Sequence, residues 1–330
     1  MSLIRLLRLF LLLLLFPTIA LANDPMGELQ KFSVFSKEDI ASLTRGGIKT
    51  AAGPPMTIYR YMSVQSCFIV PRPPNQVIAT MQRFDPTKHP ELKVYVHADL
   101  PAAPSAANFA KLNNLPNNRA VQALVAATTK TSPDLQISRA EAQKVSAGQS
   151  FVAFWTDALT KRAQDFVAGG AEAEAPYDHT REALQPGKEF AGLVRQQGPI
   201  GRQFGGFLNA TGLVGGKGSI RPDLYWELIE VQDQGVLSLG ATYIRPTSDG
   251  GAQVASGLYY ASSGYNVALT LHQLWQLNVD GRPSTLVWRG DLISAPSIGD
   301  LHGIGRLAAE SAMRKDISRA AATLQEESSR

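Results

Sequence analysis

The residues best suited to chemistry lie in the last third of the chain, inside apolar runs that alternate with turn-forming segments. His272 stands among leucines and a tryptophan, and Arg289 and Asp291 lie two positions apart. Side chains two apart in a strand project to the same side of a sheet, so Arg289 and Asp291 are expected to pair on one sheet surface. The alternative is a polar anchor inside an apolar cavity. His272 has the same two interpretations, a histidine of the core or sheet surface or one that faces a cavity.

Aromatic side chains are concentrated in the same runs. Most of them are expected in the core, although aromatic residues with a few polar groups also line ligand pockets. In the same runs, His272, Arg289 and Tyr259 are the polar groups that would orient a ligand. The candidate ligand-binding residues are Tyr225, Tyr259, His272, Trp275, Trp288 and Arg289.

Catalytic and metal-binding signatures are missing from the sequence. It has no G-x-S-x-G elbow and no H-E-x-x-H pair, and none of its five histidines pairs with another at metal-ligand spacing. The glycine-rich run 212–219 fails the phosphate-loop spacing, because Gly218 separates Lys217 from Ser219. The sequence therefore predicts no catalytic residue, no metal site and no cofactor.

The elements that must position these residues are strands. Five runs rich in β-branched and aromatic residues predict strands at 224–231, 236–245, 253–261, 266–277 and 285–294. The segments between them are short and rich in turn formers. Because a parallel return needs a crossover of about a dozen residues, these strands are expected to pair antiparallel. The resulting meander has an apolar face that needs a cover.

The cover is expected to be a helix from 301 to about 324, with Asp300 as its N-cap. Met313, Ile317, Ala320 and Leu324 recur at helical spacing and form an apolar stripe. We therefore predict an α+β fold, in which a curved antiparallel sheet wraps around a long C-terminal helix.

The upstream sequence adds further elements and a long insertion. An edge strand is predicted at 48–52, a strand at 64–70, a helix at 75–83 and a strand at 93–100. The segment 101–218 follows as a mostly helical insertion, with helices at 117–130 and within 182–197, the latter cut by Pro186 and Gly187. Ser138 and Glu141 form a capping box that predicts one helix continuing to Gly169. Eight glycines in 198–218 predict a mobile or tightly folded loop.

The order of these elements resembles that of the START and polyketide-cyclase-like (SRPBCC) superfamily, whose fold is called helix-grip. The resemblance rests on the strand meander, on the final helix with Gly303-Ile304-Gly305-Arg306, and on the strand, proline run, helix and His89-Pro90 between 64 and 100. It covers 56–100 and 223–324, and the insertion 101–218 departs from the family's short connection. The resemblance implies a single domain over 23–330 that carries a lipid, sterol-like or polyketide-like molecule.

The first 22 residues have the pattern of a cleaved export signal. Arg5 and Arg8 precede an apolar core that is too short to span a bilayer, and Ala20-Leu21-Ala22 offers a small-x-small cleavage site. Cleavage after Ala22 would deliver the chain to the periplasm or the cell exterior. It would also lower the formal charge from +4 to +2, because both arginines leave and no acidic residue does. This charge, without a dense basic stripe, argues against nucleic acid as a partner. Cys67 is the single cysteine, so no intramolecular disulfide forms.

We therefore predict an exported START-like protein that binds a hydrophobic small molecule in an internal cavity. Two alternatives stay open, a cyclase- or hydrolase-type enzyme on the same fold and an exported protein-interaction module with a closed cavity. A peripheral contact with a membrane is also left open. The sequence identifies neither the ligand nor the oligomeric state.

Overall fold

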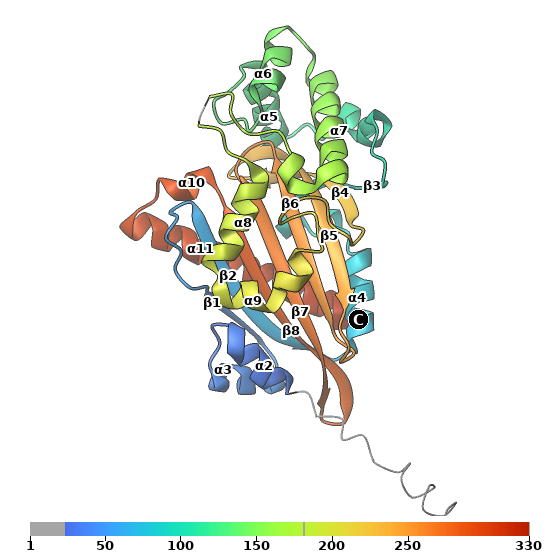
Figure 1. Cartoon of the computed structure of the whole chain (residues 1–330), viewed down its shortest axis with the longest axis vertical. Coiled ribbons are helices and arrows are strands. Elements are labelled where there is room, and N and C mark those ends of the chain that lie inside the picture. Colours follow the sequence, from blue (N-terminus) through green and yellow to red (C-terminus); the bar gives the residue numbers. More distant parts are fainter. Residues whose placement is uncertain (1–23, 181, 330) are drawn as a thin grey trace, which may run out of the picture.

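A computed structural model describes residues 24–180 and 182–329, so the export signal predicted at 1–22 lies outside the described residues. Within them, eight strands form one antiparallel sheet with the order β1-β2-β8-β7-β6-β5-β4-β3. The strands are β1 (Ile48–Ala52), β2 (Tyr61–Val70), β3 (Val94–Leu100), β4 (Asp223–Val231), β5 (Gln234–Pro246), β6 (Ala252–Ala261), β7 (Val267–Val279) and β8 (Arg282–Ser294). This sheet, a helical middle segment and a long C-terminal helix confirm the predicted α+β fold (Figure 1).

The five predicted strands of the meander are confirmed, and several are longer than expected. Two tight turns explain the extra length. Gln232 and Asp233 connect β4 to β5, Asp280 and Gly281 connect β7 to β8, and all four residues have positive φ. Two-residue turns of this kind match the twist of the flanking strands. β7 therefore runs to 279 and β8 begins at 282, beyond the predicted ends at 277 and 285.

β2 joins the N-terminal part of the chain to the meander. It lies between β1 and β8, with Ser66 opposite Arg289 and Cys67 opposite Trp288. At the other edge of the sheet, β3 pairs with β4. The first hundred residues therefore supply both edges of the sheet, and the meander fills its middle.

One side of the sheet, which we call the closed face, carries Trp226, Trp275 and Trp288 in the larger of two hydrophobic clusters. Helices of the N-terminal and middle segments cover this face, and α8 and α9 lie directly in front of the strands in Figure 1. The helices of these segments are α2 (Pro25–Phe32), α3 (Lys37–Ser42), α5 (Arg119–Thr129), α6 (Arg139–Ser146), α7 (Phe151–Gly169), α8 (Pro186–Gln196) and α9 (Gly198–Leu208). Short 3₁₀ helices occur at Leu43–Arg45, Pro86–Lys88, Pro90–Leu92, Ala106–Asn114 and Gly170–Ala173.

The opposite side, which we call the α11 face, carries Phe68, Leu274 and Val287 in a smaller cluster. α4 (Pro74–Arg83) packs over these residues together with Ala321 and Leu324 from the end of α11 (Gly303–Ser329). α11 contacts β1, β2 and α4, and the short α10 (Pro296–Gly299) precedes it. The predicted cover is therefore present, and its last turns supply its buried surface.

The first half of α11 is much less buried than its end. Ile304 is 86% exposed and Leu307 is 66% exposed, while Met313 and Ile317 are half-buried. α11 is the longest helix among the described residues, and it is not apolar. None of the described helices is both long and apolar enough to cross a lipid bilayer.

Three predictions for the middle segment are wrong, for identifiable reasons. The helix expected from Ser138 to Gly169 breaks into α6 and α7, because Gly148 adopts a φ of +85° and Ser150 caps a new helix. The first half of the glycine-rich segment 198–218 forms the helix α9, because burial of Phe204 and Phe207 outweighs the low helix propensity of glycine. Pro186 does not cut a helix but begins α8 at its first turn, where proline loses no hydrogen bond.

Candidate ligand-binding site

The six candidate residues divide evenly between the two sides of the sheet. Tyr225, His272 and Arg289 lie on the α11 face, because their strand parity is that of Val287 and Leu274. Tyr259, Trp275 and Trp288 belong to the cluster on the closed face. The structure therefore does not bring the six residues together into one site.

The three residues on the closed face are core residues. Tyr259 stacks on Phe166 of α7 with a ring separation of 3.8 Å. The Trp288 ring lies 4.9 Å from that of Phe32, and its indole nitrogen donates to Gln65 Oε1 at 3.1 Å. All three candidates are at most 3% exposed.

On the α11 face, His272 and Arg289 are direct neighbours on β7 and β8, whereas Tyr225 is three strands away on β4. Tyr225 lies so close over Gly240 that a Cβ at this glycine would approach the tyrosine ring to 2.1 Å. Tyr225 thus packs against its own sheet. His272 and Arg289 are the two candidates that the fold places side by side.

The two residues belong to a polar row that crosses four strands. Thr50 of β1, Ser66 of β2, Arg289 of β8 and His272 of β7 lie opposite one another in register. Together we call them the polar row. It is formed by the pairing of β2 with β8, between segments far apart in the sequence. Thr50 and Ser66 were not among the candidates, although Ser66 alternates with Val64 and Phe68 in a predicted strand.

The predicted pairing of Arg289 and Asp291 is confirmed. Arg289 donates from Nε to Asp291 Oδ2 at 2.7 Å and from Nη2 to Oδ1 at 2.8 Å. Thr270 Oγ1 donates to the same carboxylate at 2.8 Å. Two parallel bonds fix the plane of the guanidinium group, and Nη1 takes no part in them. The Arg289 side chain is 15% exposed and that of Asp291 4%.

The other members of the polar row have buried polar atoms without hydrogen-bond partners in the protein. These atoms are Thr50 Oγ1, Ser66 Oγ and both ring nitrogens of His272. Ser66 is fully buried and His272 is 8% exposed. An unpaired buried polar group destabilises a fold by roughly 1–3 kcal/mol, so such groups are normally paired. Ser66 and His272 lie directly on either side of Arg289, and Thr50 lies next to Ser66, which makes this row the binding candidate on the α11 face.

The charges of the row are set by burial and by the ion pair. Burial lowers the pKa of His272 to about 3, with a further contribution from the Arg289 charge. His272 is therefore neutral near pH 7 and offers one donor and one acceptor. Burial opposes the charge of Arg289, but the Asp291 carboxylate outweighs this effect and raises the pKa of Arg289. The row therefore presents a guanidinium group whose charge is offset by Asp291 and whose Nη1 lies outside that pair, flanked by neutral groups that can form hydrogen bonds.

Apolar residues border the polar row on both sides along the strands. Toward the end of α11 lies the covered cluster of Phe68, Val287 and Leu274. In the other direction comes a second polar row with Asp291 and Thr270, and beyond it the half-buried Ile293, Ala268 and Leu258 in register. A polar band between apolar surfaces suits a ligand with one polar end and one apolar end.

The described residues hold no group of three or more histidine, cysteine, aspartate or glutamate side chains able to bind a metal ion. Cys67 is buried on the closed face, where burial raises the pKa of its thiol to about 12. It therefore stays protonated and unreactive near pH 7.

Comparisons with known proteins add no family to this description. No model of a protein family matches the chain, and a search of curated protein sequences finds no relative.

Proposed function

We propose that the protein binds an amphipathic small molecule with an anionic head group, such as a fatty acid, on the α11 face. Its head group would lie on the polar row, and its apolar part between the sheet and α11. The observation that carries this proposal is the position of Arg289, held by Asp291 and flanked by buried, unpartnered groups of Ser66 and His272. The proposal includes kinship with the START and polyketide-cyclase-like proteins, which the order of strands and terminal helix supports. The leader predicted at 1–22 would place this binding outside the cytoplasm.

The head group follows from the hydrogen-bonding capacity of the polar row. A carboxylate accepts hydrogen bonds only. Arg289 Nη1, the Ser66 hydroxyl and one ring nitrogen of neutral His272 are all able to donate. Because the Arg289–Asp291 plane is fixed before binding, little conformational entropy is lost when the head group is held.

The apolar part follows from half-buried apolar side chains of the sheet and of α11. Ile293, Ala268 and Leu258 present apolar surface from the sheet, and Met313 and Ile317 do so from α11. Apolar surface removed from water contributes roughly 25 cal/mol per Å². The weakly buried first half of α11 leaves this region accessible from one end.

The test compares a carboxylic acid with an alcohol of the same chain. Binding of dodecanoic acid and dodecanol to the purified protein is measured by displacement of Nile red. We expect the acid to bind more tightly, and Arg289→Gln to weaken its binding about tenfold, or ~1.4 kcal/mol, by removing a charged donor. Binding of the alcohol, unchanged in this variant, shows that the variant is folded.

The matched control is Arg282→Gln, at an exposed arginine of the β7–β8 hairpin on the same strand. It is expected to leave both affinities unchanged. Equal affinities of the wild-type protein for acid and alcohol, or an equal loss of both in Arg289→Gln, would overturn the proposal.

A further inference from the structure

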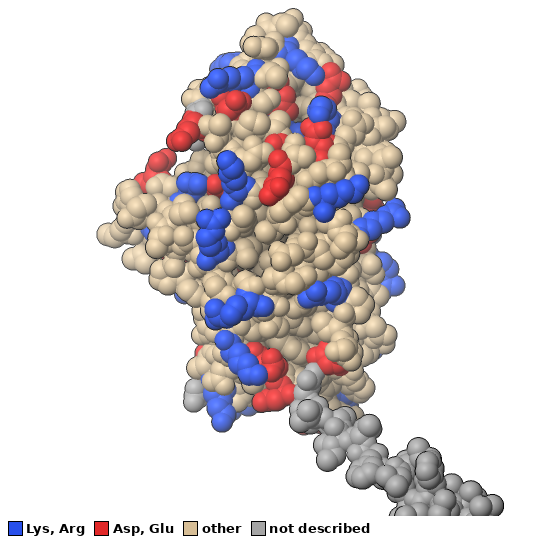
Figure 2. Space-filling model, viewed as in Figure 1, with Lys and Arg blue, Asp and Glu red and all other residues tan. Residues whose placement is uncertain are grey.

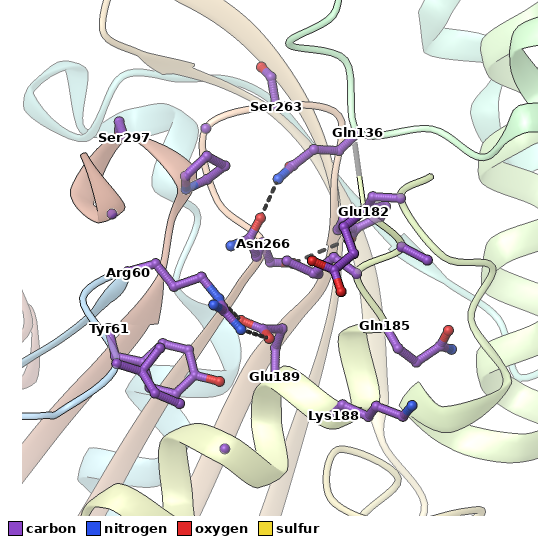
Figure 3. A pocket seen from close by; sticks show the side chains of 18 of the residues that line it. Arg60, Tyr61, Gln136, Glu182, Gln185, Lys188, Glu189, Ser263, Asn266 and Ser297 are labelled. Carbon is purple, nitrogen blue, oxygen red and sulfur yellow. Dashed lines mark hydrogen bonds and ion pairs between the residues drawn. The ribbon is translucent and has the colours of Figure 1, made fainter. Parts of the chain in front are cut away.

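A separate pocket of about 1290 Å³ lies where β2 begins and β8 ends. Its walls come from the β1–β2 connection, from the segment before α6, and from α8 with the residues that precede it (Figure 3). None of the six predicted site residues lines it, nor does any residue of the polar row. It is therefore a second candidate site, independent of the first.

The floor of the pocket holds a charged pair. Arg60 donates from Nε to Glu189 Oε2 at 2.9 Å and from Nη2 to Oε1 at 2.7 Å. The Glu189 side chain is only 5% exposed, whereas that of Arg60 is 40% exposed. Ser294 Oγ also donates to Glu189 Oε2, at 2.5 Å. The carboxylate is thus fixed by three donors, and the guanidinium group keeps an edge toward the open space.

Polar side chains continue this network across the floor, as Figure 3 shows. Asn266 Nδ2 donates to Ser294 Oγ at 2.9 Å, and the amides of Gln136 and Asn266 are in contact at 2.8 Å. Asn266 and Gln136 are 2% and 6% exposed. These groups are anchored on the sheet and a neighbouring segment, so their positions are set before any ligand arrives.

Close packing between α8 and β2 aims Glu189 at this floor. A Cβ at Gly192 would lie 2.2 Å from the Tyr61 hydroxyl oxygen, so only glycine lets α8 approach β2 this closely. Burial and the Glu189 charge raise the pKa of Tyr61 to about 12. Tyr61 therefore stays neutral, and the charges of Arg60 and Glu189 offset each other. The floor does not select its ligand by net charge.

We propose that this pocket binds a neutral oligosaccharide. Adjacent hydroxyl groups of a sugar ring can donate to the Glu189 carboxylate and accept from Arg60, which a purely accepting anion cannot do. The planar amides of Gln136 and Asn266, bonded to each other and to Ser294, hold this floor in place. Tyr59 is 61% exposed and its ring lies beside that of His302, so it provides an aromatic surface at the rim for the apolar side of a sugar. The volume and the open mouth suit a chain of sugar units that extends out of the pocket.

The test begins with the fluorescently labelled full-length chain, without its leader, on an array of neutral and charged glycans. The best neutral oligosaccharide is then titrated by calorimetry. We expect Arg60→Gln and Tyr59→Ala each to weaken its binding at least tenfold. Val125→Ala, at an exposed apolar position of α5 outside the pocket, is the matched control for Tyr59→Ala and is expected to bind as the wild type does.

Arg60→Gln removes the partner of a buried carboxylate and risks misfolding, so Tyr59→Ala decides the outcome if that variant does not fold. Arg289→Gln is expected to bind the oligosaccharide unchanged, which separates this pocket from the polar row. The proposal is overturned if no neutral glycan is bound at millimolar concentration, if only charged glycans are bound, or if Tyr59→Ala binds with wild-type affinity.

Discussion

Two arginines, one beyond each face of the sheet, show how differently the same side chain is used. Arg162 of α7 is fully buried and donates to Glu141 from Nε at 2.9 Å and from Nη2 at 2.6 Å. Its Nη1 donates to Glu174 at 3.3 Å and to the carbonyl of Ala175 at 3.0 Å. On the α11 face, Arg289 is paired with one carboxylate and keeps Nη1 out of that pair. An arginine such as Arg162, whose three guanidinium nitrogens all donate hydrogen bonds within the protein, has a structural role. An arginine such as Arg289, with one nitrogen outside its ion pair, has a donor left to recognise a ligand.

The surroundings of Arg162 are also more tightly packed than those of Arg289. The insertion side is packed with aromatic residues, and Arg162 itself lies 4.3 Å above the Tyr260 ring. The α11 face has a small cluster, a polar row and a helix that is buried mainly at its end. The large core supplies most of the apolar burial, so the other face tolerates groups that are poorly satisfied in the protein alone. On the side of the molecule that carries α8 and α9, Lys and Arg side chains are spread over the surface (Figure 2).

The largest expected effect is on the closed face. Trp288→Ala removes a fully buried ring that contacts Phe32 and Phe204, and should lower the free energy of unfolding by about 3–5 kcal/mol. Urea denaturation followed by far-UV circular dichroism measures the loss. A change below about 1 kcal/mol would mean that this core is not the main source of stability.

An intermediate effect is expected from the pH dependence of the α11 face. His272 is neutral in the folded protein, with a pKa of about 3, and has its ordinary pKa near 6.5 when unfolded. Protonation therefore favours the unfolded chain, and stability present above about pH 6.5 is lost as the pH falls toward 3. The loss from His272 amounts to about 2 kcal/mol between roughly pH 7.5 and 5.

Urea denaturation of the wild type and of His272→Gln at both pH values isolates this contribution, since the other histidines are common to both proteins. The variant should lose about 2 kcal/mol less than the wild type over that range. Identical pH dependence of the unfolding free energy in the two proteins would show that folding does not lower the pKa of His272.

The smallest effect is expected in the first half of α11. Ile304→Ala and Leu307→Ala should each change the free energy of unfolding by less than about 0.5 kcal/mol, because both side chains are largely exposed. Leu324→Ala, in the buried end of the same helix, should cost about 2 kcal/mol or more. Equal losses at all three positions would show that α11 packs along its whole length.

Local patterns predict much of this fold. The strand positions follow from alternation and from turn formers, and the spacing of two between Arg289 and Asp291 predicts their pairing. Ser138 correctly predicts the start of α6, since a capping box depends only on residues three apart. The end of α6 at Ser146 is harder to predict, because Ser150 begins another helix after only a short break at Gly148.

The candidate site is harder to predict because its members meet only through tertiary pairing. His272 and Arg289 could be proposed from their apolar surroundings, but Thr50 and Ser66 join them through the register between β2 and β8. The aromatic candidates Trp275 and Trp288 lie on the same strands as His272 and Arg289, but their side chains point to the opposite side of the sheet. Which side of a strand faces solvent or a ligand depends on what covers it, and here the N-terminal and middle segments cover the side that carries Trp275 and Trp288.

The position of β2 has a further consequence for how the protein matures. At the seam between β2 and β8, the side chains of Gln65 and Trp288 are hydrogen-bonded across 223 positions of sequence, so this seam forms only after nearly the whole chain has been synthesised. Contacts of such long range slow folding, and β2, which can pair early with β1, must wait for β8 on its other edge. The polar row straddles this seam, with Thr50 and Ser66 contributed by the first segment and Arg289 and His272 by the last. A chain truncated before β8 therefore lacks Arg289, the charged member of the row.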